Sequence, residues 1–324
     1  MGSAEELLGV TSLSGPQIYE LACKQTVAIK TEYTTVNLFG VATPKAASGS
    51  GFIISDDGYI LTNYHVIESA AKDNSAVTVL LHDGSTCTAS IVGVERESDL
   101  ALLKIDGNGL SAATIGDSDA LSVGEPVFAV GNPLGELSFS QTSGTVSALN
   151  RDIDATIGGQ PYSVNMFQID AAINSGNSGG PVYNTHGEVI GVVTAKYYSS
   201  GIEGLGFAIP INDAMRIADE LKLHGYVTGK PDLGTETTDV TSGMAAYYGI
   251  AKGAYVDSVT LNGSADKAGL MQGDVITAID GKNVTCQRDL EEALKTYRAG
   301  DTAELTVMRT GDTVKLSVTF DEAR

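Results

Sequence analysis

Short segments in which apolar and polar residues alternate dominate the first two thirds of the chain, and this is the pattern of β-strands with one buried face. Asp57-Gly58, Asp83-Gly84 and His186-Gly187 separate several of these segments, and such pairs are typical of tight turns. Many short strands joined by turns predict a sandwich or a barrel rather than alternating strands and helices. The expected strands lie at 26–33, 49–55, 59–67, 76–95, 100–105, 126–131, 141–149, 167–171, 189–198 and 204–210.

Two helices are expected to flank this β-rich region. The first follows Ser14, which can cap it, and carries Pro16 in its first turn, where proline is tolerated. The second covers 212–224, with Asn212 as its N-cap and Gly225 as its C-terminal stop. We expect this helix to end the first domain.

A second unit of about 95 residues follows the stretch 225–235, which is rich in glycine and proline, and this is the size of one small domain. It combines a helix around 288–298 with expected strands at 253–259, 274–281, 303–312 and 314–320. The pattern predicts a small α+β module.

Length and composition narrow the possible functions. At 324 residues the chain exceeds the size at which a single core stops growing, so two or more domains are expected. The net charge of −20 argues against a nucleic-acid partner, because phosphate binding needs clustered Lys and Arg. Three distant cysteines indicate neither a disulfide framework nor a metal cluster, and no cofactor is expected. Met1-Gly2-Ser3 is typical of a cloning remnant, so we expect that any native signal or membrane anchor has been removed.

Ser178 lies in "AINSGNSGGPV", which fits two incompatible nucleophile motifs. One is the G-x-S-x-G elbow of α/β-hydrolases, which must run into a helix and be followed by an acid and then a histidine. A turn and the strand pattern at 189–198 follow Ser178 instead, and the downstream histidines, His186 and His224, lie at a turn and at a helix end. The other motif is the nucleophile loop of chymotrypsin-type proteases, in which the histidine and the acid precede the serine.

His65 and Asp99 supply that order upstream of Ser178. An imidazole that titrates near neutrality can take the proton of a weakly nucleophilic hydroxyl, and a buried carboxylate can hold the tautomer of the imidazole. The backbone N–H groups of Gly176 and Ser178 are the expected donors to the developing oxyanion. Asp170 also lies in a motif-like context but is expected to be structural.

The segments "LTNYHVI", "SDLALLKI", "GNP", "QIDAAINSGNSGGPV" and "GLGFAIP", in this order, resemble the HtrA (DegP/DegQ-type) family of trypsin-like serine proteases. "DSVTLNGSADKAGLMQGDVITAIDG" resembles the PDZ domain that those proteases carry. The resemblance implies a mainly β fold, with a chymotrypsin-like double β-barrel that holds the active site between two six-stranded barrels. A small α+β PDZ domain follows. The implied boundaries are 1–19 for an N-terminal segment, 20–226 for the protease domain and 232–324 for the PDZ domain.

The sequence departs from the family pattern at Tyr64, Ser175 and Ile169, where asparagine, proline and threonine are usual. None of these positions is a triad member or an oxyanion-hole glycine, so we expect the activity to be retained.

The resemblance also implies roles for residues outside the triad. Ala172 and Ile173 are expected to line a hydrophobic S1 pocket that accepts small aliphatic side chains, because no charged residue stands at its floor. Arg151 resembles the sensor arginine of HtrA regulatory loops, and the loop is expected at 151–165, just before the segment that carries Ser178. The carboxylate-binding loop of the PDZ domain is expected at Leu233-Gly234-Thr235, although Thr235 replaces the usual isoleucine. "GLGF" at 204–207 is rejected for that role because it precedes the domain-ending helix.

The expected function is endoproteolysis of unfolded or damaged proteins without ATP, with PDZ-mediated recognition of C-terminal peptides and regulation. The alternative is a peptide-binding chaperone or scaffold whose proteolysis is minor or latent. Family resemblance implies a homotrimer located outside the cytoplasm, in the periplasm or at the cell surface, and anchored to a membrane by a segment that has been removed.

Overall fold

The computed structural model describes residues 12–36, 42–107, 109–132, 139–157, 160–194 and 205–323. These residues form two compact units, Met1–Gly225 and Tyr226–Arg324, which are described separately. The first unit is mainly β and holds two closed barrels, as predicted.

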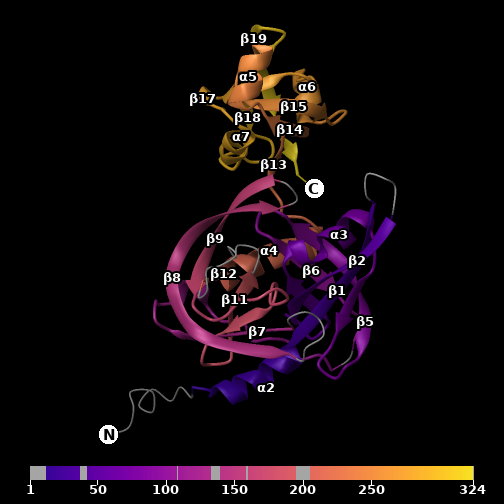
Figure 1. Ribbon diagram of the computed structural model, residues 1–324, viewed down its shortest axis with the longest axis vertical. Coiled ribbons are helices and arrows are strands. Elements are labelled where there is room, and N and C mark those ends of the chain that lie inside the picture. Colours follow the sequence, from indigo (N-terminus) through magenta and orange to yellow (C-terminus); the bar gives the residue numbers. More distant parts are fainter. Residues whose placement is uncertain are drawn as a thin grey trace. The chain divides into compact units, whose positions relative to one another are not determined.

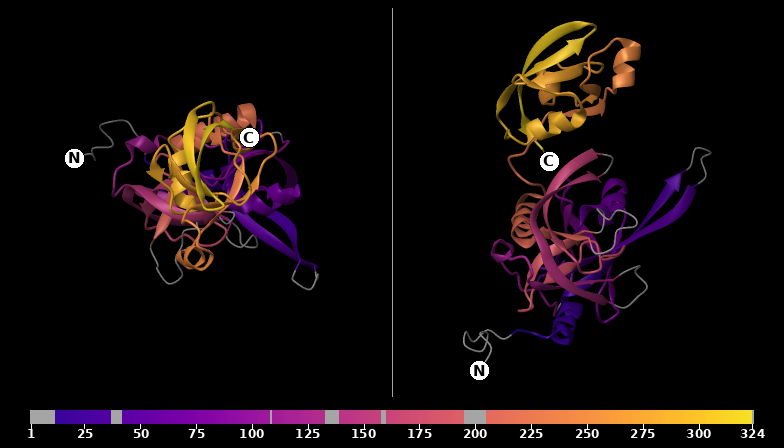
Figure 2. Two further views of the ribbon diagram at one scale, coloured as in Figure 1. Left: turned by 90° about the horizontal axis from the view of Figure 1, so that it is seen from above. Right: turned by 60° about the vertical axis from the view of Figure 1, so that its left-hand side comes forward.

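The first barrel is closed by six antiparallel strands in the order β1-β2-β3-β6-β5-β4. β1 and β2 pair along their whole length, and in Figures 1 and 2 their hairpin projects beyond the barrel. Inward-facing aliphatic side chains such as Ile29, Ile60, Ala101 and Leu103 fill the interior. The strands are β1 (Thr26–Val36), β2 (Ala42–Ile53), β3 (Tyr59–Thr62), β4 (Val77–Leu80), β5 (Thr86–Glu95) and β6 (Leu100–Lys104).

The second barrel has the order β10-β11-β12-β9-β8-β7 and is again closed and antiparallel. β8 is long and curves around the outside of this barrel in Figure 1. The core of the second barrel includes Val127, Phe167, Val182 and Ala208. The strands are β7 (Pro126–Gly131), β8 (Ser140–Ile157), β9 (Gln160–Ile169), β10 (Pro181–Tyr183), β11 (Val189–Thr194) and β12 (Gly206–Pro210).

Two buried hydrogen bonds tie the second barrel to segments that flank the first. Tyr183 on β10 donates its hydroxyl to Oε1 of Gln25, which precedes β1, at 3.0 Å. Nε2 of Gln25 donates to the carbonyl of Ala112, in the segment between the barrels, at 3.0 Å. Burial raises the pKa of Tyr183 well above its usual value, so the phenol stays neutral and remains a donor. These bonds satisfy polar groups that would otherwise be costly to bury.

The helices of the first unit agree with the sequence in part. α2 (Gly15–Gln25) begins after a capping box at Ser14, as expected. α4 (Ile211–His224) ends at Gly225 with a φ of 82°, but Pro210 rather than Asn212 occupies its N-cap position. Asn212 instead donates to Asp117 at 2.7 Å, which ties the start of α4 to the short 3-10 turn η1 (Ser118–Ala120).

One expected strand is wrong. The segment 59–67 is a strand only as far as Thr62, after which α3 (Tyr64–Asp73) begins. The apolar run Tyr64, Val66 and Ile67 faces the barrel interior from a helix, with Ala70 one turn later. A short apolar run of this kind does not distinguish a strand from a buried helix.

The second unit is a small α+β module, as expected. Its sheet has the order β14-β15-β16-β18-β19, with β17 paired to β16, and a second sheet pairs β13 with β20. Its core gathers Leu233, Val256, Ile276, Leu305 and Phe320. The strands are β13 (Pro231–Asp232), β14 (Thr235–Asp239), β15 (Ala254–Val259), β16 (Val275–Ile279), β17 (Lys282–Asn283), β18 (Thr302–Arg309), β19 (Asp312–Thr319) and β20 (Asp321–Glu322).

Three helices accompany this sheet: α5 (Ser242–Tyr248), α6 (Ser264–Ala268) and α7 (Gln287–Leu294). Only α7 was expected from the sequence, and it is four residues shorter at its C-terminal end than the predicted segment 288–298. α5 and α6 are each one to two turns long, which is too short for a clear helical period.

Candidate active site

His65 and Asp99 are in direct contact although 34 positions separate them. Nδ1 of His65 lies 2.7 Å from Oδ2 of Asp99, and the backbone N–H of His65 donates to Oδ1 at 3.0 Å. Asp99 is fully buried, whereas 18% of the His65 side chain is exposed. Because Nδ1–H is the donor that a carboxylate requires, the geometry assigns the proton of the neutral ring to Nδ1 and leaves Nε2 as an acceptor.

Asp99 also completes the helix that carries His65. The first N–H groups of a helix have no partner within it, and the side chain of Asn63 does not cap α3. The carbonyl of Asp99 accepts from the N–H of Tyr64 at 3.1 Å and from Nδ2 of Asn63 at 2.9 Å. Asp99 adopts a left-handed φ of 54°, which aspartate tolerates better than most residues. Asp99 therefore orients the imidazole through its side chain and anchors the start of α3 through both its side chain and its main-chain carbonyl.

The second barrel contributes a further contact to this carboxylate. Thr194, the last residue of β11, places its hydroxyl 3.4 Å from Oδ2 of Asp99 and is itself buried. Thr194 could not be predicted as a site residue from the sequence, because it is 95 positions from Asp99. With this bond, Asp99 receives hydrogen bonds from both barrels.

Two consecutive tight turns lie between β9 and β10, and Ser178 is in the second of them. The N–H of Asn177 closes the first turn on the carbonyl of Asn174 at 3.0 Å, and the N–H of Gly180 closes the second on Asn177 at 2.9 Å. Gly176 and Gly179 occupy the third positions of these turns with φ of 98° and 82°, which favours glycine. The turn-closing donors are thus Asn177 and Gly180, and the N–H groups of Gly176 and Ser178 are not used to close either turn.

The turn of Ser178 packs closely on the chain that leads to His65. A Cβ atom at Gly179 would overlap the carbonyl oxygen of Ser50 and the hydroxyl of Thr62, and would lie 3.0 Å from the backbone nitrogen of Asn63. The residue after the serine therefore contacts the residue two before the histidine. The turn of Ser178 thus packs on the residues that precede His65, and His65 in turn contacts Asp99.

We expect Gly179→Ala to lower the free energy of unfolding by about 3 kcal/mol or more, because the methyl group overlaps buried backbone. Gly84→Ala is a matched control, since Gly84 has a φ of 83° but no atom within 4 Å of the added Cβ. It should lose only about 1 kcal/mol from backbone strain. Chemical denaturation of both variants measures the difference, and equal losses would contradict the packing described around Ser178.

Ala172 and Ile173, expected to line the S1 pocket, lie in the segment after β9 and differ in exposure. Ala172 is exposed, and its carbonyl accepts from the hydroxyl of Thr142 at 3.0 Å. Ile173 is buried in the core of the second barrel against Gly206 on β12. The carboxylate of Asp170 accepts from the backbone N–H and the hydroxyl of Thr145, which supports the structural role expected for it.

Arg151 lies in β8 rather than in a loop. The segment 151–165, expected to be a regulatory loop, continues the antiparallel pairing of β8 with β9, in which Arg151 opposes Met166. The register shifts between Ala148 and Arg151, so the strand is irregular next to this residue. The side chain of Arg151 is exposed.

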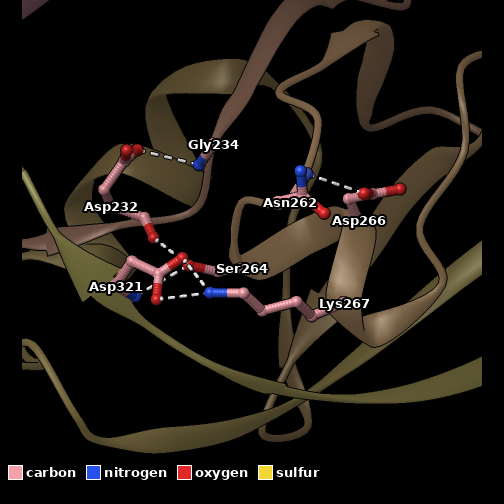
Figure 3. Close-up of polar contacts among 7 residues, drawn as sticks. All are labelled: Asp232, Gly234, Asn262, Ser264, Asp266, Lys267 and Asp321. Atoms are coloured by element: carbon pink, nitrogen blue, oxygen red, sulfur yellow. Dashed lines mark hydrogen bonds and ion pairs between the residues drawn. The ribbon is translucent and has the colours of Figure 1, made fainter.

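The expected PDZ loop, Leu233-Gly234-Thr235, joins β13 to β14. Leu233 is buried in the core of its unit and Gly234 has a left-handed φ of 72°. The N–H of Gly234 donates to Oδ1 of Asp232 at 2.8 Å, as drawn in Figure 3. The "GLGF" segment rejected as a PDZ loop runs into β12 of the second barrel; Gly204 lies outside the described residues.

Two family models match the chain. One is described as a trypsin-like peptidase domain and matches residues 49–192, and the other is described as a PDZ domain and matches residues 231–320. A solved structure of the HtrA-type protease AlgW with a decapeptide is 31% identical in sequence. The similarity covers 96% of this chain and 99% of that one with a TM-score of 0.62. The chain belongs to the HtrA family.

Other HtrA-type proteins give the same result. The serine endoprotease from Yersinia pestis is 30% identical with a TM-score of 0.61, covering 97% of this chain and all of that one. Serine protease Do-like HtrB from Bacillus subtilis is 42% identical over 278 residues, covering 82% of this chain. A probable periplasmic serine endoprotease, DegP-like, from Ectopseudomonas mendocina is 42% identical over 275 residues, covering 84% of this chain. The chain spans 60% and 56% of the lengths of these two curated relatives.

Two further findings concern the described part of the chain. None of its helices combines the length and apolar character that crossing a bilayer requires. Within the same residues, no group of three His, Cys, Asp or Glu side chains is placed to hold a metal ion.

Proposed function

We propose that this HtrA-family chain is a serine endopeptidase with Ser178 as nucleophile, His65 as general base and then acid, and Asp99 as the orienting carboxylate. The contact of 2.7 Å between His65 and the fully buried Asp99 carries the proposal, because it leaves Nε2 of His65 as the ring acceptor that a general base requires.

In the first half of the reaction, Oγ of Ser178 attacks the carbonyl carbon of the scissile peptide while its proton passes to Nε2 of His65. The backbone N–H groups of Gly176 and Ser178 stabilise the resulting oxyanion. Collapse of the tetrahedral species breaks the C–N bond, and the leaving amine takes the proton from His65. Water then repeats the sequence on the acyl-enzyme, with His65 again acting first as base and then as acid.

The substrates that we propose are unfolded or damaged proteins, with peptides bound by the PDZ domain. Support comes from relatives named serine protease and endoprotease and from the AlgW structure with a bound decapeptide. We further propose a location outside the cytoplasm, because several relatives are named periplasmic. The homotrimer and the membrane anchor expected from the family belong to this proposal, as do the domain boundaries 20–226 and 232–324.

Digestion of β-casein by the purified chain, followed by gel electrophoresis, tests the proposal directly. The second candidate function is a peptide-binding chaperone, favoured by a PDZ module in the same chain. Suppression of aggregation of a thermally unfolded protein tests that function in parallel. Cleavage of casein supports the protease, whereas suppression of aggregation without any cleavage favours the chaperone.

Cleavage specificity is expected to be aliphatic. Ala172 and Ile173 offer small or apolar surfaces where a protease that cuts after basic residues needs a carboxylate. Mass spectrometry of casein fragments should therefore show mainly Val, Ala, Leu or Ile before the cut. A dominant preference for Lys or Arg would show that these two residues do not define the S1 pocket.

Arg151 is expected to take part in activation by peptides. It follows the register shift in the β8–β9 ribbon, and the segment after β9 leads to the turn of Ser178, so a change in the ribbon can reach the oxyanion donors. We expect Arg151→Ala to keep the triad but to lower basal turnover of a short fluorogenic peptide. We also expect it to weaken stimulation by a second apolar peptide. Equal stimulation of parent and variant would show that Arg151 takes no part in activation by the peptide.

A further inference from the structure

The edge of the sheet in the second unit is arranged to accept a peptide strand. β14 is the terminal strand of its sheet and pairs with β15 on one side only. α7 begins beside the other end of β14, where the N–H of Gln287 donates to Oδ1 of Asp239 at 2.6 Å. An edge strand of this kind can bind an extended peptide by main-chain hydrogen bonds, as PDZ domains do.

The loop that leads into β14 already holds a carboxylate of its own. Asp232 places Oδ1 2.8 Å from the nitrogen of Gly234, which is the middle residue of the expected carboxylate-binding loop. The carbonyl of Asp232 accepts from the hydroxyl of Ser264 at 2.7 Å, which fixes the backbone from which this side chain projects. Figure 3 shows the carboxylate of Asp232 directed at the Gly234 nitrogen.

The other charges drawn in Figure 3 are one salt bridge and one further carboxylate. Nζ of Lys267 donates to both carboxylate oxygens of Asp321, at 2.9 and 2.8 Å. Asp266 adds another carboxylate, which accepts from the N–H of Asn262 at 2.8 Å. The seven residues in Figure 3 therefore carry three carboxylates and one ammonium group, and that ammonium is already paired with Asp321.

We infer that Asp232 biases the PDZ edge against peptides with a free C-terminal carboxylate and favours extended apolar segments that bring no negative charge to the loop. Such segments are internal stretches of an unfolded chain or peptides whose C-terminus is amidated. A free carboxylate would compete with Asp232 for the Gly234 N–H and would be repelled by it. The inference rests on the peptide-binding part of the proposed function and revises the expectation of C-terminal peptides.

The test uses the full chain carrying Ser178→Ala, so that the probe is not cut. Fluorescence anisotropy measures the binding of one labelled apolar peptide as the free acid and as the C-terminal amide. Asp232→Asn removes the charge but keeps an oxygen for Gly234, whereas Asp232→Ala releases the Gly234 N–H. Asp312→Asn, an exposed carboxylate at the start of β19, controls for the general loss of one negative charge.

We expect the starting chain to bind the amide at least as tightly as the acid. Both Asp232 variants should bind the acid about tenfold more tightly, with the amide changed less than about twofold and Asp312→Asn unchanged. Tighter binding of the acid by the starting chain, unaffected by Asp232→Asn and Asp232→Ala, would overturn the inference. If no variant binds either peptide, the peptide-binding part of the proposed function fails and the inference fails with it.

A separate observation in the first unit concerns Ser50 on β2, which is fully buried. Its hydroxyl donates to the carbonyl of Gly176 at 2.7 Å and accepts from the N–H of Asn132 at 2.8 Å. Its backbone N–H donates to the carbonyl of Ser178 at 2.8 Å. Ser50 thus bonds to the peptide group between residues 176 and 177 and to the one between residues 178 and 179. The peptide group that lies between these two carries the N–H of Ser178.

We propose that Ser50 is a positioning residue for the oxyanion hole, acting from the first barrel on a turn of the second. Fixing the carbonyl of Gly176 limits rotation of the backbone between the two expected donors, Gly176 and Ser178. The carbonyl of Ser50 accepts in turn from the hydroxyl of Thr62 at 2.7 Å, so the Ser50 backbone is itself held. This proposal also rests on the proposed proteolysis.

Ser50→Ala tests it, with Thr31→Val as the control, because Thr31 is another fully buried hydroxyl of the first barrel and donates to the carbonyl of Val66 rather than to that of Gly176. Turnover of a fluorogenic peptide is normalised to the concentration of active sites. We expect Ser50→Ala to lower kcat about 10- to 100-fold with KM changed less than about threefold. Its affinity for a peptide boronic acid, whose adduct mimics the tetrahedral species, should fall by a similar factor.

A Ser50→Ala protein with the parental kcat and the parental boronate affinity would overturn this proposal, as would an equal loss in Thr31→Val. The boronate measurement also distinguishes a failure of the Ser50 proposal from a failure of the proposed protease function. A parent that neither cleaves peptide nor binds boronate contradicts the proposed protease function itself, whereas a parent with both activities leaves Ser50 alone in question.

Discussion

Replacing Ser178 by alanine is expected to lower turnover of β-casein by about 10⁴–10⁶-fold, because the attacking oxygen is lost while the rest of the site remains. The thermal midpoint should change little, since only one oxygen atom is removed from a tight turn. Ser175→Ala is a matched control, because Ser175 is an exposed serine of the same segment, and it should keep parental activity. Hydrolysis by Ser178→Ala at the rate of the parent would show that another residue is the nucleophile.

Asp99→Asn is expected to lower kcat by about 10⁴-fold with little change in KM. An amide in this position can donate to Nδ1 of His65, which favours the tautomer with its proton on Nε2 and removes the base. The asparagine is close in size to the aspartate and can still accept from the N–H of His65, so α3 should keep its start. Steady-state kinetics and circular dichroism measure the two effects separately.

Thr194→Val serves as the control for Asp99→Asn, because it deletes only the bond of 3.4 Å to the same carboxylate. We expect it to lower kcat by less than about tenfold, since both bonds from His65 remain. If Asp99→Asn were no more harmful than Thr194→Val, Asp99 would not be the residue that orients His65.

The double barrel was expected from the resemblance to the HtrA family. That the first unit consists of short strands was predictable from the residues themselves, because apolar and polar residues alternate in the strand segments and turns with glycine separate them. The start of α3 was not. Its first N–H groups bond to Asp99, which is 35 positions from Tyr64, so no local capping residue marks the change from strand to helix.

The same reason explains which parts of the site were missed. His65, Asp99 and Ser178 were recognised because their motifs surround them in the sequence. Ser50 was not recognised, because its partner Gly176 lies 126 positions away and a buried serine in a glycine-rich strand has no distinctive pattern. Asp232 immediately precedes the predicted loop, but whether its side chain points into the loop depends on backbone angles that the sequence alone does not give.

The segment 151–165 illustrates a different limit. The segment was expected to be a loop because Arg151 resembles the sensor arginine of HtrA regulatory loops, yet residues 151–157 and 160–165 pair as parts of β8 and β9. A resemblance to a family loop therefore missed a strand that cross-strand pairing forms.

The proposal that Ser178 is the nucleophile and His65 its base is tested most directly by treating the purified chain with a fluorophosphonate probe. Mass spectrometry of the digested protein then shows which residue carries the probe. Such probes form a stable bond to a serine whose hydroxyl is activated by an adjacent base. We expect a single adduct on Ser178. This adduct should disappear in His65→Ala while that variant remains folded. Hydrolysis of casein by a chain that carries no adduct on Ser178, or an adduct whose yield does not depend on His65, would contradict the proposal.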